Sequence, residues 1–250
     1  MNFQKRKQAI LKKLGDTGDA DIKALAAQLD ASEITIRRDL NRLAADGLLY
    51  RTHGGATKVN PLELPYPFAN KAAVNVAAKD AICRRAAAEI SDGDIIFMDC
   101  GSTVYRLCQF LKNKKIQVIT NSLPVVCELQ NSRVSVNIIG GEFDAERQAV
   151  HGKMAEYHIG HYRATKAFLG VDGLSSAGLF ANSEKEAAMT LALAARSATT
   201  WLLCDASKLG RESYLRFSDV RLANTLITDA PASACRFLTK AGVTVIRVQS

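Results

Sequence analysis

Glycines, hydroxyls, amides and carboxylates follow five successive apolar stretches in the second part of the chain. Gly101, Ser102 and Thr103 come just after the first stretch, where hydroxyls and free backbone N–H groups suit a phosphate. Lys208 adds a cation after the fifth stretch, and the carboxylates and amides suit hydroxyl groups. The candidate effector-binding residues are Asp99, Gly101, Ser102, Thr103, Asn121, Ser122, Gly140, Gly141, Asp172, Glu184 and Lys208. Together they predict a pocket for a phosphorylated sugar.

Each of these short motifs also has an ordinary structural explanation. Residues 101–103 can cap a helix, Gly140-Gly141 can form a turn, and Asp172-Gly173 is a common turn dipeptide. The carboxyl ends of parallel strands meet at one edge of a sheet. Five strand ends in series therefore favour one shared pocket over five unrelated turns.

A second group of chemically useful residues lies near the N-terminus, between residues 32 and 58. On a helical wheel, Ile36, Leu40 and Leu43 fall on one side, and the opposite side carries arginines and an amide. Such groups suit base edges and phosphates of double-stranded DNA. The candidate DNA-binding residues are Ser32, Ile34, Thr35, Arg37, Arg38, Asn41, Arg42, Arg51, His53, Gly54 and Lys58.

Three helices and a small hairpin must position this second group. Apolar spacing predicts helices over residues 3–14, from residue 21, and over residues 32–45, with Ser32 as N-cap and a break at residues 15–18. A strand at residues 48–51 and a glycine-rich turn at 53–56 then predict a winged helix–turn–helix. The alternative from spacing alone is an ordinary three-helix bundle with a solvated basic face.

The residue identities in this region are more specific than the spacing of its apolar residues. The run from Ser32 to Ala56, with T-I-R-R-D-L at 35–40 and H-G-G-A at 53–56, resembles the N-terminal signature of the DeoR family of bacterial transcriptional regulators. The D-C-G-S-T, T-N-S, F-L-G-V-D-G and D-A-S-K-L-G motifs resemble that family's C-terminal domain. The chain departs from the family pattern at Lys71, where an Arg is usual, and at Ala78, where a Glu is usual. The resemblance implies a metabolite-controlled regulator with a phosphorylated sugar as effector.

The rest of the chain is predicted to form a linker and a larger domain. Three of the five prolines fall at residues 61, 65 and 67, which predicts domains at 1–57 and 76–250 joined by a linker at 58–75. In the larger domain, strands are expected at residues 94–99, 116–120, 134–139, 166–171, 200–204, 225–228 and 243–248. Helices are expected at 80–90, 103–111, 123–130, 154–162, 183–196 and 232–241. This alternation predicts a doubly wound, mostly parallel α/β domain.

Composition restricts the partners and the location. The net charge is +8, and residues 1–60 carry half of that excess, which suits a basic nucleic-acid module. We expect no membrane span or signal peptide, and so a cytoplasmic protein. The six cysteines form no C-x-x-C pair and are expected to be reduced. His151, His158 and His161 cluster without a second ligand pair, so a structural or surface role and no metal or cofactor are expected.

Two other functions remain open at this point. A sugar-phosphate isomerase with a DNA-binding head would need a carboxylate base and an acid. Asp172, Glu184 and Lys208 are available for these roles. The second Asp and the triple glycine usual in ribose-5-phosphate isomerases are lacking, so we expect a sensor and no catalytic residue. An RNA-binding role is disfavoured because aromatics are only 6% of the chain. We expect a repressor of a sugar operon that acts as a dimer or tetramer.

Overall fold

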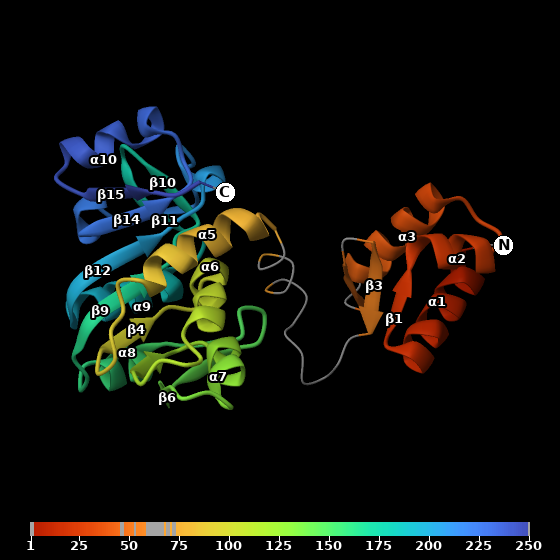
Figure 1. The fold of residues 1–250 in the computed structure, drawn as a ribbon, viewed down its shortest axis with the longest axis horizontal. Coiled ribbons are helices and arrows are strands. Elements are labelled where there is room, and N and C mark those ends of the chain that lie inside the picture. Colours follow the sequence, from red (N-terminus) through yellow and green to blue (C-terminus); the bar gives the residue numbers. More distant parts are fainter. Residues whose placement is uncertain are drawn as a thin grey trace. The chain divides into compact units, whose positions relative to one another are not determined.

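The chain folds as two compact units, Met1–Ala73 and Val74–Ser250, which are described separately (Figure 1). The structure is a computed structural model that describes residues 3–45, 48–52, 54–58, 68, 71 and 74–249. No helix within those residues is long and apolar enough to cross a membrane.

The described part of the small unit is a winged helix–turn–helix, as predicted. Its helices are α1 (Phe3–Thr17), α2 (Ile22–Gln28) and α3 (Glu33–Ala45), and its strands are β1 (Asp19–Asp21), β2 (Leu49–Arg51) and β3 (Gly55–Lys58). The strands form an antiparallel sheet in the order β1-β3-β2, with Ala20 opposite Ala56 and Tyr50 opposite Thr57. Strand β3 is therefore central, and the β2–β3 hairpin forms the wing.

The core of the small unit follows from helical spacing. Ile10 and Leu14 of α1 are buried, together with Ile36, Leu40 and Leu43 of α3. An ion pair adds a polar connection between α1 and α3, since Arg6 Nε donates to Asp39 Oδ2 at 2.5 Å. Asp39 is 5% exposed, so its charge is almost entirely desolvated and requires this partner.

Two details of the small unit differ from the prediction. Helix α1 continues through Gly15 to Thr17, because Gly15 keeps a negative φ, and the chain turns at Gly18, whose φ is 81°. The Gly18 N–H then donates to Leu14 O at 3.0 Å, which is a common way to end a helix. Strand β1 was not predicted, because three residues with two carboxylates carry no strand pattern.

The large unit is built on a seven-stranded sheet in which every described neighbour pair is parallel. Its order is β15-β14-β12-β9-β4-β5-β6. The strands are β4 (Ile95–Met98), β5 (Gln117–Thr120), β6 (Ser135–Ile138), β9 (Ala164–Leu169), β12 (Ser197–Leu203), β14 (Thr225–Thr228) and β15 (Thr244–Arg247). The chain runs outward from β4 to β6, then returns to β9 and runs to the other edge. The predicted doubly wound fold is confirmed, with its switch point between β4 and β9.

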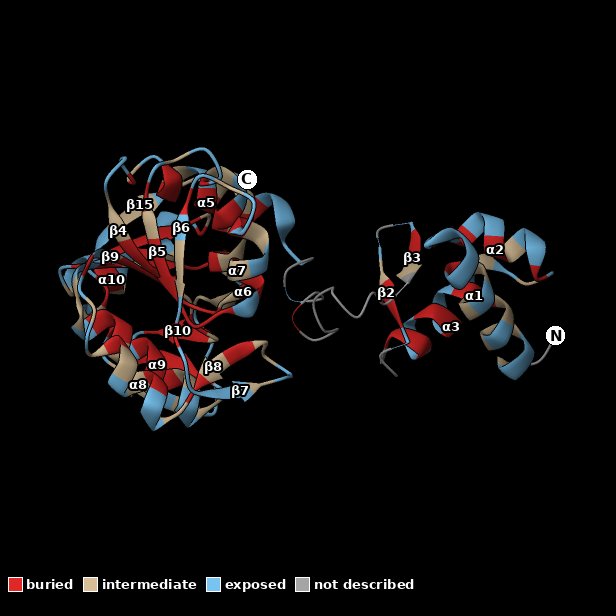
Figure 2. Cartoon of the chain, turned by 90° about the horizontal axis from the view of Figure 1, so that it is seen from below, coloured by how far each residue is buried: buried red, intermediate tan, exposed pale blue. Residues whose placement is uncertain are grey.

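Helices cover both faces of this sheet (Figure 2). On one face α5 (Val76–Ala87), α6 (Ser102–Arg106) and α7 (Leu123–Leu129) pack on side chains such as Ile96, Met98 and Val118. On the other face α8 (Lys153–Ile159), α9 (Glu184–Ala195) and α10 (Arg236–Lys240) pack on side chains such as Phe97 and Ile119. Successive residues of a strand thus alternate between two apolar cores, which explains the continuous apolar runs.

Two small antiparallel sheets were not predicted. One is the hairpin of β7 (Glu142–Asp144) and β8 (Ala149–His151), and the other contains β10 (Gly173–Ser175), β11 (Gly178–Ala181) and β13 (Leu215–Ser218). Helix α5 also begins earlier than expected, and two predicted helices divide into a 3₁₀ turn and a short α-helix. Strands of three or four residues leave too little alternation to recognise.

Gly55→Ala should destabilise the wing, because a Cβ at Gly55 would lie 2.0 Å from Ala20 O in the neighbouring strand. We expect the free energy of unfolding of the wing to fall by an amount on the order of 2 kcal/mol. Hydrogen exchange of β1 to β3 in the full chain measures it. Gly15→Ala is the matched control, since that position is open and helical, and should be neutral or stabilising. Unchanged exchange in Gly55→Ala would contradict the proposed clash.

Candidate functional site

The exposed face of α3 carries the residues predicted to meet DNA. Ile36, Leu40 and Leu43 are fully buried, as the wheel predicted, whereas Ile34 is 73% exposed. The exposed residues around Ile34 are Ser32, Arg37, Arg38, Asn41 and Arg42, with Thr35 half-buried. The result is an exposed face with three guanidinium groups and one amide.

Several contacts fix this face in place. Ser32 Oγ accepts from Thr35 N–H at 3.2 Å, which is the predicted N-cap of α3. Arg37 lies 3.8 Å from Glu33, a weak pairing of two exposed side chains. Arg51 of β2 donates from Nε to Asn41 Oδ1 at 2.9 Å, so the wing and α3 contact each other through two predicted site residues.

The turn of the wing is described only in part. Gly54 is exposed, and its carbonyl accepts from Ile22 N–H at 2.9 Å. Lys58 is the last residue of β3. His53 lies outside the described residues, so its predicted role in DNA binding stays a prediction.

In the large unit, Lys79 lies near a serine hydroxyl and a second lysine at the carboxyl end of the sheet. Lys79 of α5 is 3% exposed, and its Nζ donates to Ser102 Oγ at 3.4 Å. Burial and the nearby Lys208 ammonium lower the pKa of Lys79 to about 8, against the opposing attraction of Asp205. Lys208 donates to Val171 O at 2.6 Å. Lys79 thus has a hydroxyl and a second cation close to it, and such groups suit an anion.

Asp205 and Asn75 complete this end of the site. Asp205 Oδ1 accepts from Asn75 Nδ2 at 3.1 Å and from Ser207 Oγ at 2.5 Å. Burial raises the pKa of Asp205, but the hydrogen bonds from Ser207 and the Lys208 charge prevail and hold it below its usual value. The aspartate is therefore ionised and balances part of the lysine charge.

The other predicted effector residues have different environments. Asp99 is buried, and its two oxygens accept from the N–H groups of Cys100 and Gly170 at 2.6 and 3.1 Å. Burial raises its pKa. Gly101 precedes α6, and Thr103 Oγ1 is buried without a hydrogen-bond partner among the described residues. Asp99 thus binds backbone on both of its oxygens.

The remaining predicted residues divide between buried and exposed positions. Asn121 and Ser122 are fully buried at the end of β5, where Ser122 caps α7. Asp172 Oδ2 accepts from Asn182 N–H at 3.0 Å. Glu184 is exposed in the first turn of α9. The predicted role of Glu184 in effector binding stays a prediction.

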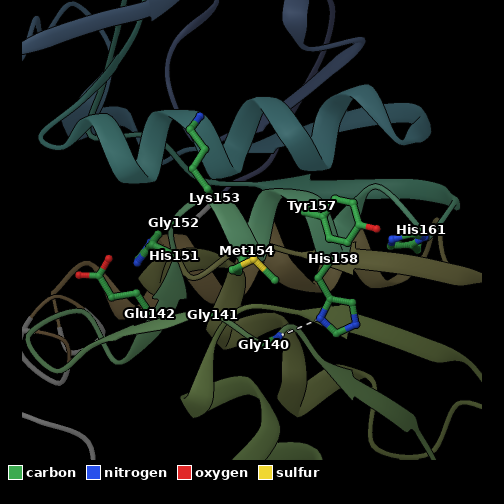
Figure 3. Close-up of a pocket in the computed structure, with 10 residues that line it drawn as sticks. All are labelled: Gly140, Gly141, Glu142, His151, Gly152, Lys153, Met154, Tyr157, His158 and His161. Atoms are coloured by element: carbon green, nitrogen blue, oxygen red, sulfur yellow. Dashed lines mark hydrogen bonds between the residues drawn. The ribbon is translucent and has the colours of Figure 1, made fainter.

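A pocket of about 780 Å³ lies beside Gly140 and Gly141 (Figure 3). Its other lining residues are Glu142, His151, Gly152, Lys153, Met154, Tyr157, His158 and His161. Gly140 N–H donates to His158 Nδ1 at 3.0 Å, and His161 contacts Tyr157 edge to face. No group of three ligand-type side chains among the described residues is arranged to hold a metal ion.

Sequence reasoning missed several residues of this site. His151 is 1% exposed in the pocket wall, and the sequence had assigned it only a structural or surface role. Asn75, Lys79 and Asp205 were also absent from the predicted site. The sequence had marked this stretch, because Asn75 and Lys79 lie close to Lys71 and Ala78, where the chain departs from the DeoR-family pattern.

The two units define a class of protein: a winged helix–turn–helix combined with a doubly wound sensor-type domain is the architecture of a transcriptional regulator. The DeoR C-terminal sensor domain matches residues 74–230, and the DeoR-like helix–turn–helix domain matches residues 6–61. The chain therefore belongs to the DeoR family of transcriptional regulators, which confirms the resemblance seen in the sequence.

Relatives of similar length include regulators of sugar operons. The lactose phosphotransferase system repressor of Lactococcus lactis subsp. lactis is 36% identical, with 92% of each chain covered. The L-fucose operon activator of Haemophilus influenzae is 30% identical, with 92% of each chain covered. Among solved structures, ribose 5-phosphate isomerase A of Methanocaldococcus jannaschii is 17% identical, with a TM-score of 0.40 over 54% of each chain.

The pKa of Lys79 predicts how the stability of the large unit changes with pH. An unfolded lysine has a pKa near 10.5, so between pH 8 and 10.5 the unfolded chain binds the extra proton and folding is favoured as pH rises. Relative to Lys79→Met, the free energy of unfolding of the wild type should therefore rise by about 3 kcal/mol between pH 8 and pH 10.5. Urea unfolding followed by the single Trp201 measures it. Lys153→Met, at a side chain 92% exposed, is the control and should show no such trend.

Proposed function

We propose that this DeoR-family protein binds operator DNA through α3 and the wing, and that a phosphorylated sugar bound to the large unit controls that binding. The observation that carries the proposal is the exposed face of α3. It presents three arginines and an amide opposite a fully buried apolar side, in a chain that belongs to a family of transcriptional regulators.

In this proposal α3 enters the major groove. Arg38, Asn41 and Arg42 reach base edges or phosphates, and Ile34 offers an apolar contact for a thymine methyl group. Ser32, Thr35 and Arg37 lie at the margin of the face. Arg51, Gly54, Lys58 and His53 contact the flanking backbone from the wing.

The ligand site is proposed at the carboxyl ends of the strands. Lys79, Lys208 and Ser102 bind the phosphate, since a dianion between the two lysines would relieve their mutual repulsion. The residues Gly101, Thr103, Asn121, Ser122, Gly140, Gly141 and Asp172 line the remainder, and Asp99 positions the loops that carry them. Glu184 is a peripheral contact at most, because it faces outward.

Control requires that the effector bind one arrangement of the DNA-binding units more tightly than another. We propose a repressor of a sugar-catabolic operon in the bacterial cytoplasm, with residues 58–75 as the linker between the two domains. One winged unit contacts little DNA, so a dimer or tetramer supplies the second half-site. The operon regulators among the relatives support a sugar as the signal.

We propose that the large unit does not catalyse a reaction. An isomerase needs a carboxylate free to move a proton. Asp172 accepts a hydrogen bond from Asn182, Glu184 is exposed, and both oxygens of Asp99 accept backbone hydrogen bonds. Turnover of a pentose or hexose phosphate by the pure protein would overturn this part of the proposal.

Arg38→Ala should weaken binding to the DNA upstream of the protein's own gene cluster by about tenfold or more, because it removes a guanidinium group from the groove. Fluorescence anisotropy at fixed, moderate salt measures the dissociation constant. Lys12→Ala removes one positive charge from the exposed side of α1 and is the matched control. Equal losses in the two variants would point to non-specific electrostatics and against α3 as the recognition helix.

Lys208→Ala should leave DNA binding intact and lower the affinity for sugar phosphates about tenfold, since one of two cations facing the phosphate is lost. Binding in the wild type should also weaken above pH 8, as Lys79 loses its proton. Calorimetric titration with sugar phosphates measures both effects, and Lys240→Ala on α10 is the control. A normal response in Lys208→Ala would place the phosphate elsewhere.

A further inference from the structure

His151 is the last residue of β8, and its ring forms part of the pocket wall (Figure 3). The strand is held at the end of β5 by two hydrogen bonds. Val150 N–H donates to Asn121 O at 2.8 Å, and Asn121 Nδ2 donates to Val150 O at 3.0 Å. The position of the imidazole is thus determined by backbone contacts on the residue before it.

The imidazole itself is unpaired. The ring is 1% exposed, and neither Nδ1 nor Nε2 has a hydrogen-bond partner among the described residues. Burial lowers the pKa of His151, although the Asp99 and Asp144 carboxylates act in the opposite direction. A neutral imidazole offers one donor and one acceptor, and buried polar groups in native proteins are almost always paired.

A second buried atom nearby has the same need. Asn121 is fully buried, its amide nitrogen is used by Val150 O, and its Oδ1 has no partner among the described residues. Met154 and Tyr157 supply an exposed apolar wall to the pocket. His151 in the pocket wall and Asn121 behind it thus offer one donor and two acceptors without partners among the described residues, which suits a ligand with several hydroxyl groups.

This polar end is distinct from the phosphate end. Asp99 is related to both ends: its charge acts on His151, and Ser102, three residues after Asp99 in the chain, accepts from Lys79. We propose that His151 is a specificity-determining residue that hydrogen-bonds hydroxyls of the bound sugar, with Asn121 Oδ1 accepting from another hydroxyl. This inference rests on the proposed function, which assigns the phosphate to the lysines.

Calorimetric titration of the full chain separates the two ends. The probes are inorganic phosphate, glycerol 3-phosphate, glucose 6-phosphate and fructose 6-phosphate. His151→Leu should bind the tightest hexose phosphate about tenfold more weakly and inorganic phosphate unchanged. His151→Gln, which keeps one donor and one acceptor, should retain most of the affinity. Wild-type affinity for every sugar phosphate in His151→Leu would overturn the inference and leave the proposed function standing.

The outcome for the wild type distinguishes the two proposals. If the wild type binds none of the sugar phosphates, the proposed function fails, and the role of His151 fails with it. Thermal unfolding provides the folding control, since removing two unpaired nitrogens should leave the melting temperature unchanged or higher. A large drop in melting temperature for both variants would indicate a structural histidine and contradict the inference.

Nitrogen NMR of the histidine-labelled full chain tests the contact without relying on a stable variant. Saturating hexose phosphate should shift the ring-nitrogen resonances of His151, which His151→Gln identifies, while inorganic phosphate should not. Unmoved His151 resonances under a bound hexose phosphate would overturn the proposal.

Discussion

The buried carboxylate of Asp99 connects β4 and β9, the adjacent strands at which the order of strands along the sheet reverses. One oxygen accepts from Cys100 N–H and the other from Gly170 N–H, so the loops leaving β4 and β9 are fixed side by side. In a doubly wound sheet the crevice opens at this reversal, and the proposed contacts of Gly101, Ser102, Thr103 and Asp172 lie on the two loops that Asp99 holds.

A buried lysine next to a second lysine is unfavourable in the absence of an anion. Lys79 is almost fully buried. Desolvation and the charge of Lys208 both disfavour its protonated form and lower its pKa. Asp205 offsets the repulsion only in part, since it also accepts hydrogen bonds from Asn75 and Ser207. In the proposed function, a phosphate dianion bound beside Lys79 would offset this repulsion, and its binding would stabilise the large unit.

The parts of the molecule that could be predicted from the sequence are those with a long repeating pattern. The wheel of α3 identified its buried side, and the apolar runs around Phe97 and Ile119 identified the parallel sheet. The β7–β8 hairpin was missed because three-residue strands carry no period. His151 was missed for the same reason. The pairing of β8 with β7 and its contact with the end of β5 place His151 in the pocket wall.

Helix α5 carries one residue of the proposed ligand site close to the start of the large unit. It begins after Asn75, whose side chain donates to both Asp205 and Ser207, and one turn later it carries Lys79. In the proposed function, a phosphate bound by Lys79 would therefore act directly on α5, the first helix of the large unit. Asn75 holds a left-handed conformation (φ 54°), which is uncommon for a residue other than glycine, and its hydrogen bonds to Asp205 and Ser207 stabilise that conformation. A change at Asp205 would therefore alter the start of the helix that carries Lys79.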